Sequence, residues 1–316
     1  MNTAAAPGTG QQTRAGQRTH PLTRVMTWEL RRFGASRIFW LQALGFFCFL
    51  LAIVGAQDWP NQVDYGRPGG GESISGFIAG TSAVGLLYSL PTSLALLVLI
   101  LPFVTADGVT RDLQRRTHEL LMTTTLPIWA YVWGRYLVGL LMSLGLALLM
   151  LAAILGMGVV LHLTVTAYPW PSTGAVLLLW VGMVLPATVL VSGVGFAMVT
   201  LLPHLSTPIK VAFLLVWIVG VFVIPRAGGD QPPTWYVNWD PTSAVTARGL
   251  LSQYSIGDVL RTANSEAHFQ NALVAMENKV PAIGGWFASH LLLGGLGLLL
   301  VLVVPLAFRR SRDVLN

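Results

Sequence analysis

The sequence is poor in charged residues. Only 10% of its 316 residues are charged and 54% are hydrophobic, whereas a soluble domain carries about 25% charged residues. Five long stretches contain no Asp, Glu, Lys or Arg: 38–57, 73–106, 136–209, 211–225 and 280–308. This composition is typical of an integral membrane protein.

Several kinds of catalytic and metal-binding pattern are also absent. Cys48 is the only cysteine, so neither a disulfide within the chain nor a cluster of metal-binding thiolates can form. The only lysines, Lys210 and Lys279, do not follow the glycine-rich loop that binds the phosphates of ATP. The histidines form no close pair, and His290 lies in an uncharged stretch without an acidic neighbour. We therefore expect no enzyme activity, no bound cofactor and no metal site in this chain.

The uncharged stretches are long enough for membrane helices, each of which needs about 20 apolar residues. The longest stretch, 136–209, must hold two helices, because the prolines and glycine of "AYPWPSTG" (167–174) interrupt it. We predict an all-α polytopic membrane protein with six transmembrane helices, near 38–57, 81–104, 134–160, 175–201, 205–225 and 286–307.

The distribution of Lys and Arg predicts the orientation, because cytoplasmic loops are enriched in these residues. Six spans place both termini on one side, together with 14 of the 19 basic residues. These are Arg14, Arg18, Arg24, Arg31, Arg32, Arg37, Arg111, Arg115, Arg116, Arg135, Lys210, Arg309, Arg310 and Arg312. We expect both termini in the cytoplasm and the protein in the plasma membrane. The basic pI follows from this topology, so no nucleic-acid partner is expected.

Five segments outside the predicted spans carry expectations of their own, and four of them are described first. Residues 1–21 are polar and predict a disordered cytoplasmic N-terminus. Residues 22–37 predict either a helix lying in the membrane interface or a basic flank that only fixes topology. Residues 58–72 predict a short flexible outer loop. The outer segment 226–285 begins irregularly and then predicts helices near 242–253 and 256–279.

The fifth such segment, 107–122, is charged and lies between the second and third predicted spans. As a helix it pairs Asp107 with Arg111 and Asp112 with Arg116, each at i, i+4 spacing with the acid first. Its apolar residues include Leu113, Leu120 and Leu121. Two interpretations remain open: a solvated helix that only anchors topology, or a helix that docks onto a partner protein.

The stretch "VTRDLQRRTHELLMTTTLPIWAYVWGRYLVGLL" (109–141) resembles the signature that follows the second span of ABC-2 type permeases. The matching residues are Asp112, Thr117, Glu119, Leu120 and Leu121, with Gly134 and Arg135 at the Gly-Lys position that opens the third span. The chain departs from the pattern at Arg116, where Gly is usual, at Thr125, where Pro is expected, and at Arg135. A looser similarity covers "VNWDPTSAVTARGLL" (237–251) through Asp240, Pro241 and Arg248.

This resemblance implies that residues 22–316 form the transmembrane domain of an ABC transporter, with export as the expected direction. ATP and Mg would be bound by a separate ATP-binding subunit, and a second permease chain, identical or related, would complete the membrane part. The segment 107–122 would be the coupling helix. Glu119 and the arginines Arg111, Arg115 and Arg116 would set its register on the ATP-binding subunit, while Leu113, Leu120 and Leu121 would fill a cleft there.

Two other functions remain open. The chain could be an ABC-type membrane subunit that transmits force, or that supports assembly of an external protein, without moving a substrate. It could also be a polytopic membrane enzyme, for which the sequence offers only the scattered polar residues His204, His268 and Asp240. An ATP-binding subunit encoded by a neighbouring gene would favour the ABC functions over the enzyme.

Overall fold

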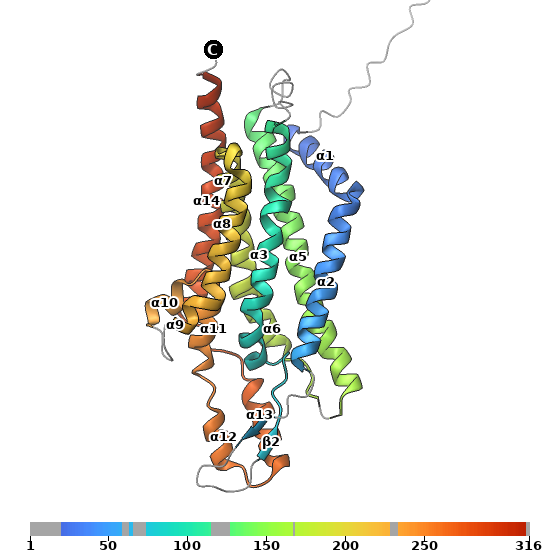
Figure 1. The fold of residues 1–316 in the computed structure, drawn as a ribbon, viewed down its shortest axis with the longest axis vertical. Helices are drawn as coiled ribbons and strands as arrows, with labels where there is room; N and C mark the ends of the chain where they lie inside the picture. The colour runs from blue at the N-terminus through green and yellow to red at the C-terminus, as the bar shows by residue number, and fades with distance from the viewer. Residues whose placement is uncertain are drawn as a thin grey trace, which may run out of the picture.

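Helices run along the long axis of the molecule and form a tall bundle (Figure 1). The structure, a computed structural model, describes residues 20–58, 63–65, 74–114, 127–166, 168–227 and 233–313. Helix α1 (Pro21–Ala35) and the C-terminal end of α14 (Gly285–Asp313) lie at one end, called here the upper end. Helices α12 (Ile256–Thr262) and α13 (Glu266–Glu277) lie at the opposite, lower end.

Six of the described helical segments are long and apolar enough to cross a membrane. This confirms the predicted number of spans by length and composition. Spans one, two, three and six are formed by α2 (Arg37–Asp58), α3 (Ala83–Gln114), α5 (Ile128–Thr164) and α14. Span four consists of α6 (Thr173–Leu179), η1 (Trp180–Val184) and α7 (Leu185–Leu201), and span five of η2 (Pro203–Leu205), α8 (Ser206–Ile218) and η3 (Val219–Val223).

The helix that contains span three begins before the predicted start of the span. Helix α5 starts at Ile128 instead of residue 134 and has 37 residues, which corresponds to about 55 Å at 1.5 Å per residue. The hydrocarbon core of a bilayer is only about 30 Å thick, so α5 must tilt or extend beyond it. The prediction placed the start next to Arg135 because a charge is costly within a membrane. The structure instead places Arg135 in the third turn of the helix, beside an acidic partner.

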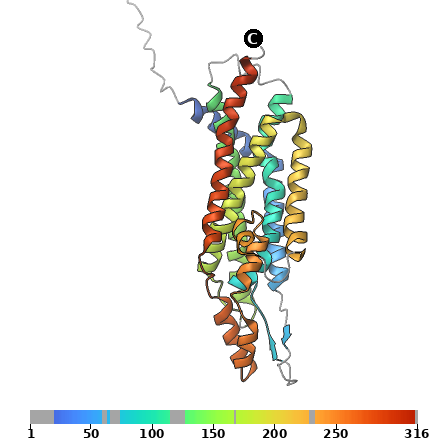
Figure 2. The same cartoon turned by 90° about the vertical axis from the view of Figure 1, so that its left-hand side faces the viewer.

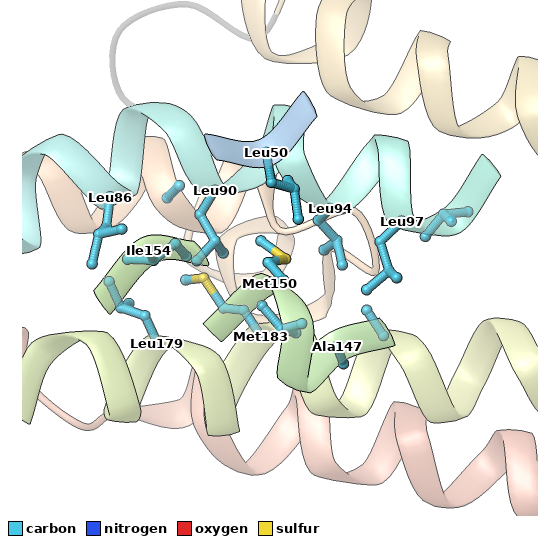
Figure 3. Packing of buried hydrophobic residues seen from close by; sticks show 14 of the residues in the cluster. Leu50, Leu86, Leu90, Leu94, Leu97, Ala147, Met150, Ile154, Leu179 and Met183 are labelled. Carbon is cyan, nitrogen blue, oxygen red and sulfur yellow. The ribbon is translucent and has the colours of Figure 1, made fainter. Parts of the chain in front are cut away.

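Spans two and four form the centre of the bundle. In their most apolar windows, 67% and 61% of the residues are buried, against 22% and 28% for spans one and five. Leu86, Leu90, Leu94 and Leu97 follow one another along one face of α3 and lie close to Met150 of α5 (Figure 3). The remaining labelled residues of this core are Leu50, Ala147, Ile154, Leu179 and Met183.

Spans four and five are each interrupted by one π-helical segment, η1 and η3. Each segment contains a glycine against which a side chain from elsewhere in the chain packs. A Cβ atom on Gly182 of η1 would lie 2.7 Å from Cζ3 of Trp286, and one on Gly220 of η3 would lie 2.5 Å from Cγ2 of Thr242. A larger residue at either position would therefore force the packed side chain away.

The short elements that follow span five, and those that precede span two, lie in the lower part of the molecule (Figure 1). Strands β1 (Val63–Tyr65) and β2 (Ile74–Gly76) pair in an antiparallel sheet, where the sequence predicted only a loop up to residue 72. Figure 2 shows this pair beside the helices of the lower end. Short helices follow span five in the order α9 (Ile224–Ala227), α10 (Thr234–Trp239), α11 (Ala244–Leu251), α12 and α13.

The single helix predicted at 256–279 is divided into α12 and α13. Ala263 leaves the helical conformation, and the side chain of Ser265 accepts a hydrogen bond from the backbone N–H of His268, which starts a new helix. Helix α13 is fastened to the chain just before span two. The Gln270 amide both accepts from the backbone N–H and donates to the carbonyl of Phe77, while Glu277 accepts from the backbone N–H of Ala79 at 3.0 Å.

Candidate functional site

The predicted coupling segment begins within α3, whose last turns lie at the upper end of the bundle (Figure 1). Residues 107–114 form the last turns of α3, which continues from span two without a break. The side chains of Asp107, Arg111, Asp112 and Leu113 lie outside the described part. Also outside it, backbone included, are Arg115, Arg116, Thr117, Glu119, Leu120 and Leu121. A helix over the whole of 107–122 therefore stays a prediction.

Helix α1 packs against the first turns of α5. Gly134 makes this contact possible, because a Cβ atom there would lie 2.7 Å from Cγ1 and 2.8 Å from Cβ of Val25. The glycine at the Gly-Lys position thus has a steric role. It lets the backbone of α5 approach the side chain of a buried residue on α1.

Arg135, the next residue, forms a buried ion pair with Glu29 of α1. The Nη1 atom of Arg135 lies 2.5 Å from Oε1 of Glu29, and each side chain is only 2% exposed. Arg32 also approaches Glu29, at 3.1 Å. The Arg135 guanidinium lies over two aromatic rings, with its carbon 4.9 Å from the centroid of Trp28 and 5.1 Å from that of Tyr131. An arginine suits this position, because its planar group can pair with a carboxylate and stack on aromatic faces at once.

We call Val25, Glu29, Gly134 and Arg135 the upper joint. A buried ion pair depends on the geometry of its two partners, because each charge would be strongly destabilised without the other. The upper joint therefore fixes the position of α1 on α5. The sequence identified Gly134 and Arg135 but missed Glu29. A signal was present, since Glu29 is the only acidic residue in the arginine-rich segment 22–37.

A second buried polar group lies in the turn between α10 and α11, towards the lower end. The Asp240 carboxylate accepts hydrogen bonds from the backbone N–H and hydroxyl of Thr242, at 2.9 and 2.7 Å, and from the backbone N–H of Val245 at 2.6 Å. Ser243 follows with a positive φ of 61°. Its hydroxyl lies 3.4 Å from Nε2 of His290 on α14. We call Asp240, Thr242, Ser243 and His290 the lower cluster.

The lower cluster brings together residue types found in hydrolases, although the sequence indicated no acidic partner for His290. Nδ1 of His290 lies 2.7 Å from the carbonyl of Trp286, so Nε2 is the nitrogen that faces Ser243. However, Ser243 and His290 are at most 1% exposed. The nearby backbone N–H groups that could stabilise an oxyanion already bond to Asp240 and Thr242. These contacts match a buried structural turn better than a catalytic centre.

The other polar residues considered for an enzyme are not brought together. His204 lies on η2, at the upper end, and His268 lies on α13, at the lower end. Among the described residues, no group of three or more His, Cys, Asp or Glu side chains could hold a metal ion.

Comparisons of the chain with known protein families, with curated proteins and with solved structures find no match.

Proposed function

We propose that this protein is the permease subunit of an ABC transporter, and that it works as an exporter. The segment 107–122 is its coupling helix, and a separate subunit binds and hydrolyses ATP. The observation that carries the proposal is the upper joint. Gly134 matches the permease signature and Arg135 takes the place of its lysine, and both residues contact α1 within the first turns of α5.

The arrangement of the helices supports this function. Span two runs into the proposed coupling segment, since α3 includes residues 107–114, and α5 begins six positions after the end of that segment, at Ile128. Span two is also the most buried of the six. A displacement of the segment by an ATP-binding subunit would therefore act on the centre of the bundle. The upper joint would carry the same displacement to α1.

The proposal includes the environment and the partners of the chain. The protein lies in the plasma membrane with both termini in the cytoplasm, which makes the upper end cytoplasmic and the lower end external. A second permease chain, identical or related, completes the membrane part. This chain itself needs no cofactor, because ATP and Mg are bound by the partner subunit.

A charge reversal tests the docking of the coupling segment. Glu119→Arg should abolish binding of the ATP-binding subunit or uncouple its ATP hydrolysis, because reversing one member of a buried charge pair leaves the other uncompensated. The double change Leu120→Ala and Leu121→Ala should act similarly through lost apolar contact. The assay is pull-down of the ATP-binding subunit together with ATP hydrolysis, at matched expression level.

The matched control is Asp258→Arg, because Asp258 is exposed at the opposite end of the molecule. It should leave pull-down and ATP hydrolysis unchanged. If both coupling-segment variants behave like this control, the segment only anchors topology, and the proposal fails.

Labelling of introduced cysteines tests the orientation, in a Cys48→Ser background. A membrane-impermeant maleimide added outside should modify a cysteine introduced by Asp258→Cys but not one introduced by Thr117→Cys. The opposite pattern would overturn the proposed topology.

One observation favours a second function, transmission of force without substrate movement. Helix α3 leads into the proposed coupling segment, and the chain just before it is held by Gln270 and Glu277 of α13. A motion of the segment could thus reach α13 through a single helix. Transport assays in liposomes separate the two functions, because only an exporter moves a substrate during ATP hydrolysis.

A further inference from the structure

Residues 234–251, called here the α10–α11 hairpin, form one compact unit within the bundle. The Thr246 hydroxyl on α11 donates to the carbonyl of Val237 on α10 at 2.5 Å. Gly249 allows the two helices to touch, because a Cβ atom there would lie 2.8 Å from the methyl groups of Val237. Asp240 closes the turn by accepting from Thr242 and Val245. These contacts are internal, so the hairpin can move as a single body.

The α10–α11 hairpin lies between spans five and six. Towards span six, Ser243 lies 3.4 Å from Nε2 of His290, and α10 packs along α14. Towards span five, the Thr242 methyl group packs on Gly220 of η3, and Arg248 donates a hydrogen bond to the carbonyl of Pro225. The hairpin thus bridges two spans that are adjacent in the sequence.

The two sides of this bridge differ in how easily they can separate. Span five is among the least buried spans, at 28%. It contacts the hairpin at a π-helical segment, an irregularity that is frequent at functional sites. The contact at Gly220 is a methyl group against a backbone and its loss breaks no hydrogen bond, although full separation would also break the hydrogen bond from Arg248 to Pro225. On the other side, α10 packs against α14, and that packing holds the hairpin on span six.

We propose that the α10–α11 hairpin is a latch, which closes the bundle by seating Thr242 on Gly220 and which separates from span five as one body during the working cycle. This inference rests on the proposed function, because binding and hydrolysis of ATP by the partner subunit would drive an opening that the hairpin also undergoes spontaneously at a lower rate. Span five moves relative to the hairpin, while the hairpin stays with span six.

A disulfide between positions 220 and 242 tests the latch, because it would prevent the hairpin from leaving span five. A Cβ atom on Gly220 would lie 3.5 Å from Cβ of Thr242, which is within the range of a disulfide. In a Cys48→Ser background, the pair Gly220→Cys and Thr242→Cys should form a disulfide on oxidation. The oxidised complex with the ATP-binding subunit should lose most of its ATP hydrolysis and recover it on reduction.

The matched control is a disulfide within the hairpin. A Cβ atom on Gly249 would lie 3.4 Å from Cβ of Val237, so Val237→Cys and Gly249→Cys should also pair. Because this bond joins parts that move together, the oxidised control should keep its ATP hydrolysis. The latch is refuted if the disulfide between positions 220 and 242 leaves ATP hydrolysis unchanged. It is also refuted if this disulfide and the one between positions 237 and 249 abolish ATP hydrolysis equally.

A second measurement does not depend on ATP hydrolysis. In the Cys48→Ser background, a cysteine introduced by Thr242→Cys should react with a membrane-impermeant maleimide faster than one introduced by Thr246→Cys. Both positions are buried, but only residue 242 is uncovered when the hairpin leaves span five. If the background protein supports no partner-dependent ATP hydrolysis, the permease proposal fails, and this labelling decides the latch alone. Equal reactivity of the two cysteines would contradict the latch.

Discussion

The two ends of the molecule use buried polar groups in different ways. In the upper joint, Glu29 and Arg135 are opposite charges contributed by α1 and α5, separated by more than 100 residues of chain. In the lower cluster, the Asp240 carboxylate is satisfied within six residues of sequence, by Thr242 and Val245. Breaking the upper joint exposes each charge to a low-dielectric environment, whereas the hairpin keeps its internal bonds when it moves. The upper joint is therefore suited to holding two elements together, and the lower hairpin to moving as a unit.

The largest effect is expected from Arg135→Ala, which leaves Glu29 buried without its main partner. Removing one member of a buried pair costs about 3–5 kcal/mol, and the nearby Arg32 should keep the loss towards the lower value. The measurement is thermal unfolding in detergent. Arg31→Ala on the exposed side of α1 is the control and should change stability by less than about 0.5 kcal/mol. Equal effects of the two variants would show that the upper joint contributes nothing.

A smaller effect is expected from Gly134→Ala. The added Cβ atom would lie 2.7 Å from Cγ1 of Val25 and should push α1 away, at a cost of about 1–3 kcal/mol. Gly145 lies on the same helix with no atom near its would-be Cβ, so Gly145→Ala should be neutral or stabilise by up to about 1 kcal/mol. Thermal unfolding of both variants decides the point, and a stabilising Gly134→Ala would contradict the close approach of α1.

Asp240→Ala should have a similar cost but a more local consequence. It leaves the backbone N–H groups of Thr242 and Val245 without their acceptor, at about 1–3 kcal/mol. We expect faster hydrogen exchange in α11 with little change in α1, whereas Arg135→Ala should do the reverse. The exposed Asp258→Ala is the control. Faster exchange spread over both ends would remove the contrast between the upper joint and the lower cluster.

The smallest effect concerns Tyr254, which follows α11. Burial raises the pKa of its phenol to about 12, and its hydroxyl donates to the carbonyl of Lys279 at 2.7 Å. Because the folded state favours the protonated phenol, its contribution to stability is complete below pH 10 and declines as the pH rises from 10 towards 12. Tyr254→Phe should lower the unfolding temperature at neutral pH. Between pH 10 and 12 the unfolding temperature of this variant should fall less than that of the unchanged protein. If the unfolding temperature depends on pH in the same way in both proteins, the Tyr254 phenol does not contribute to stability as described.

Much of the fold follows from the positions of charged residues. The uncharged stretches predicted six spans, and the structure has six helices of sufficient length and hydropathy. The helix of span three is longer than the predicted span. Arg135 marked the predicted start of the span, whereas α5 begins at Ile128 and includes the buried pair of Arg135 with Glu29.

The contacts between distant segments could not be read from local patterns. Gln270 bonds to Phe77 across 193 residues, and nothing in either segment indicates the other. The same holds for Thr242 on Gly220, because helical periodicity does not indicate that a π-helical segment will form there. At the site, the sequence supplied Gly134 and Arg135, while the partner Glu29 depended on how α1 folds back onto α5.

ATP hydrolysis by the purified protein, with and without a co-purifying ATP-binding subunit, tests the central claim most directly. The account predicts no hydrolysis by this chain alone, hydrolysis by the complex in liposomes, and loss of that activity in Glu119→Arg but not in Asp258→Arg. Robust hydrolysis by a preparation free of any second subunit would contradict the proposed function, and so would a complex whose activity is indifferent to Glu119→Arg.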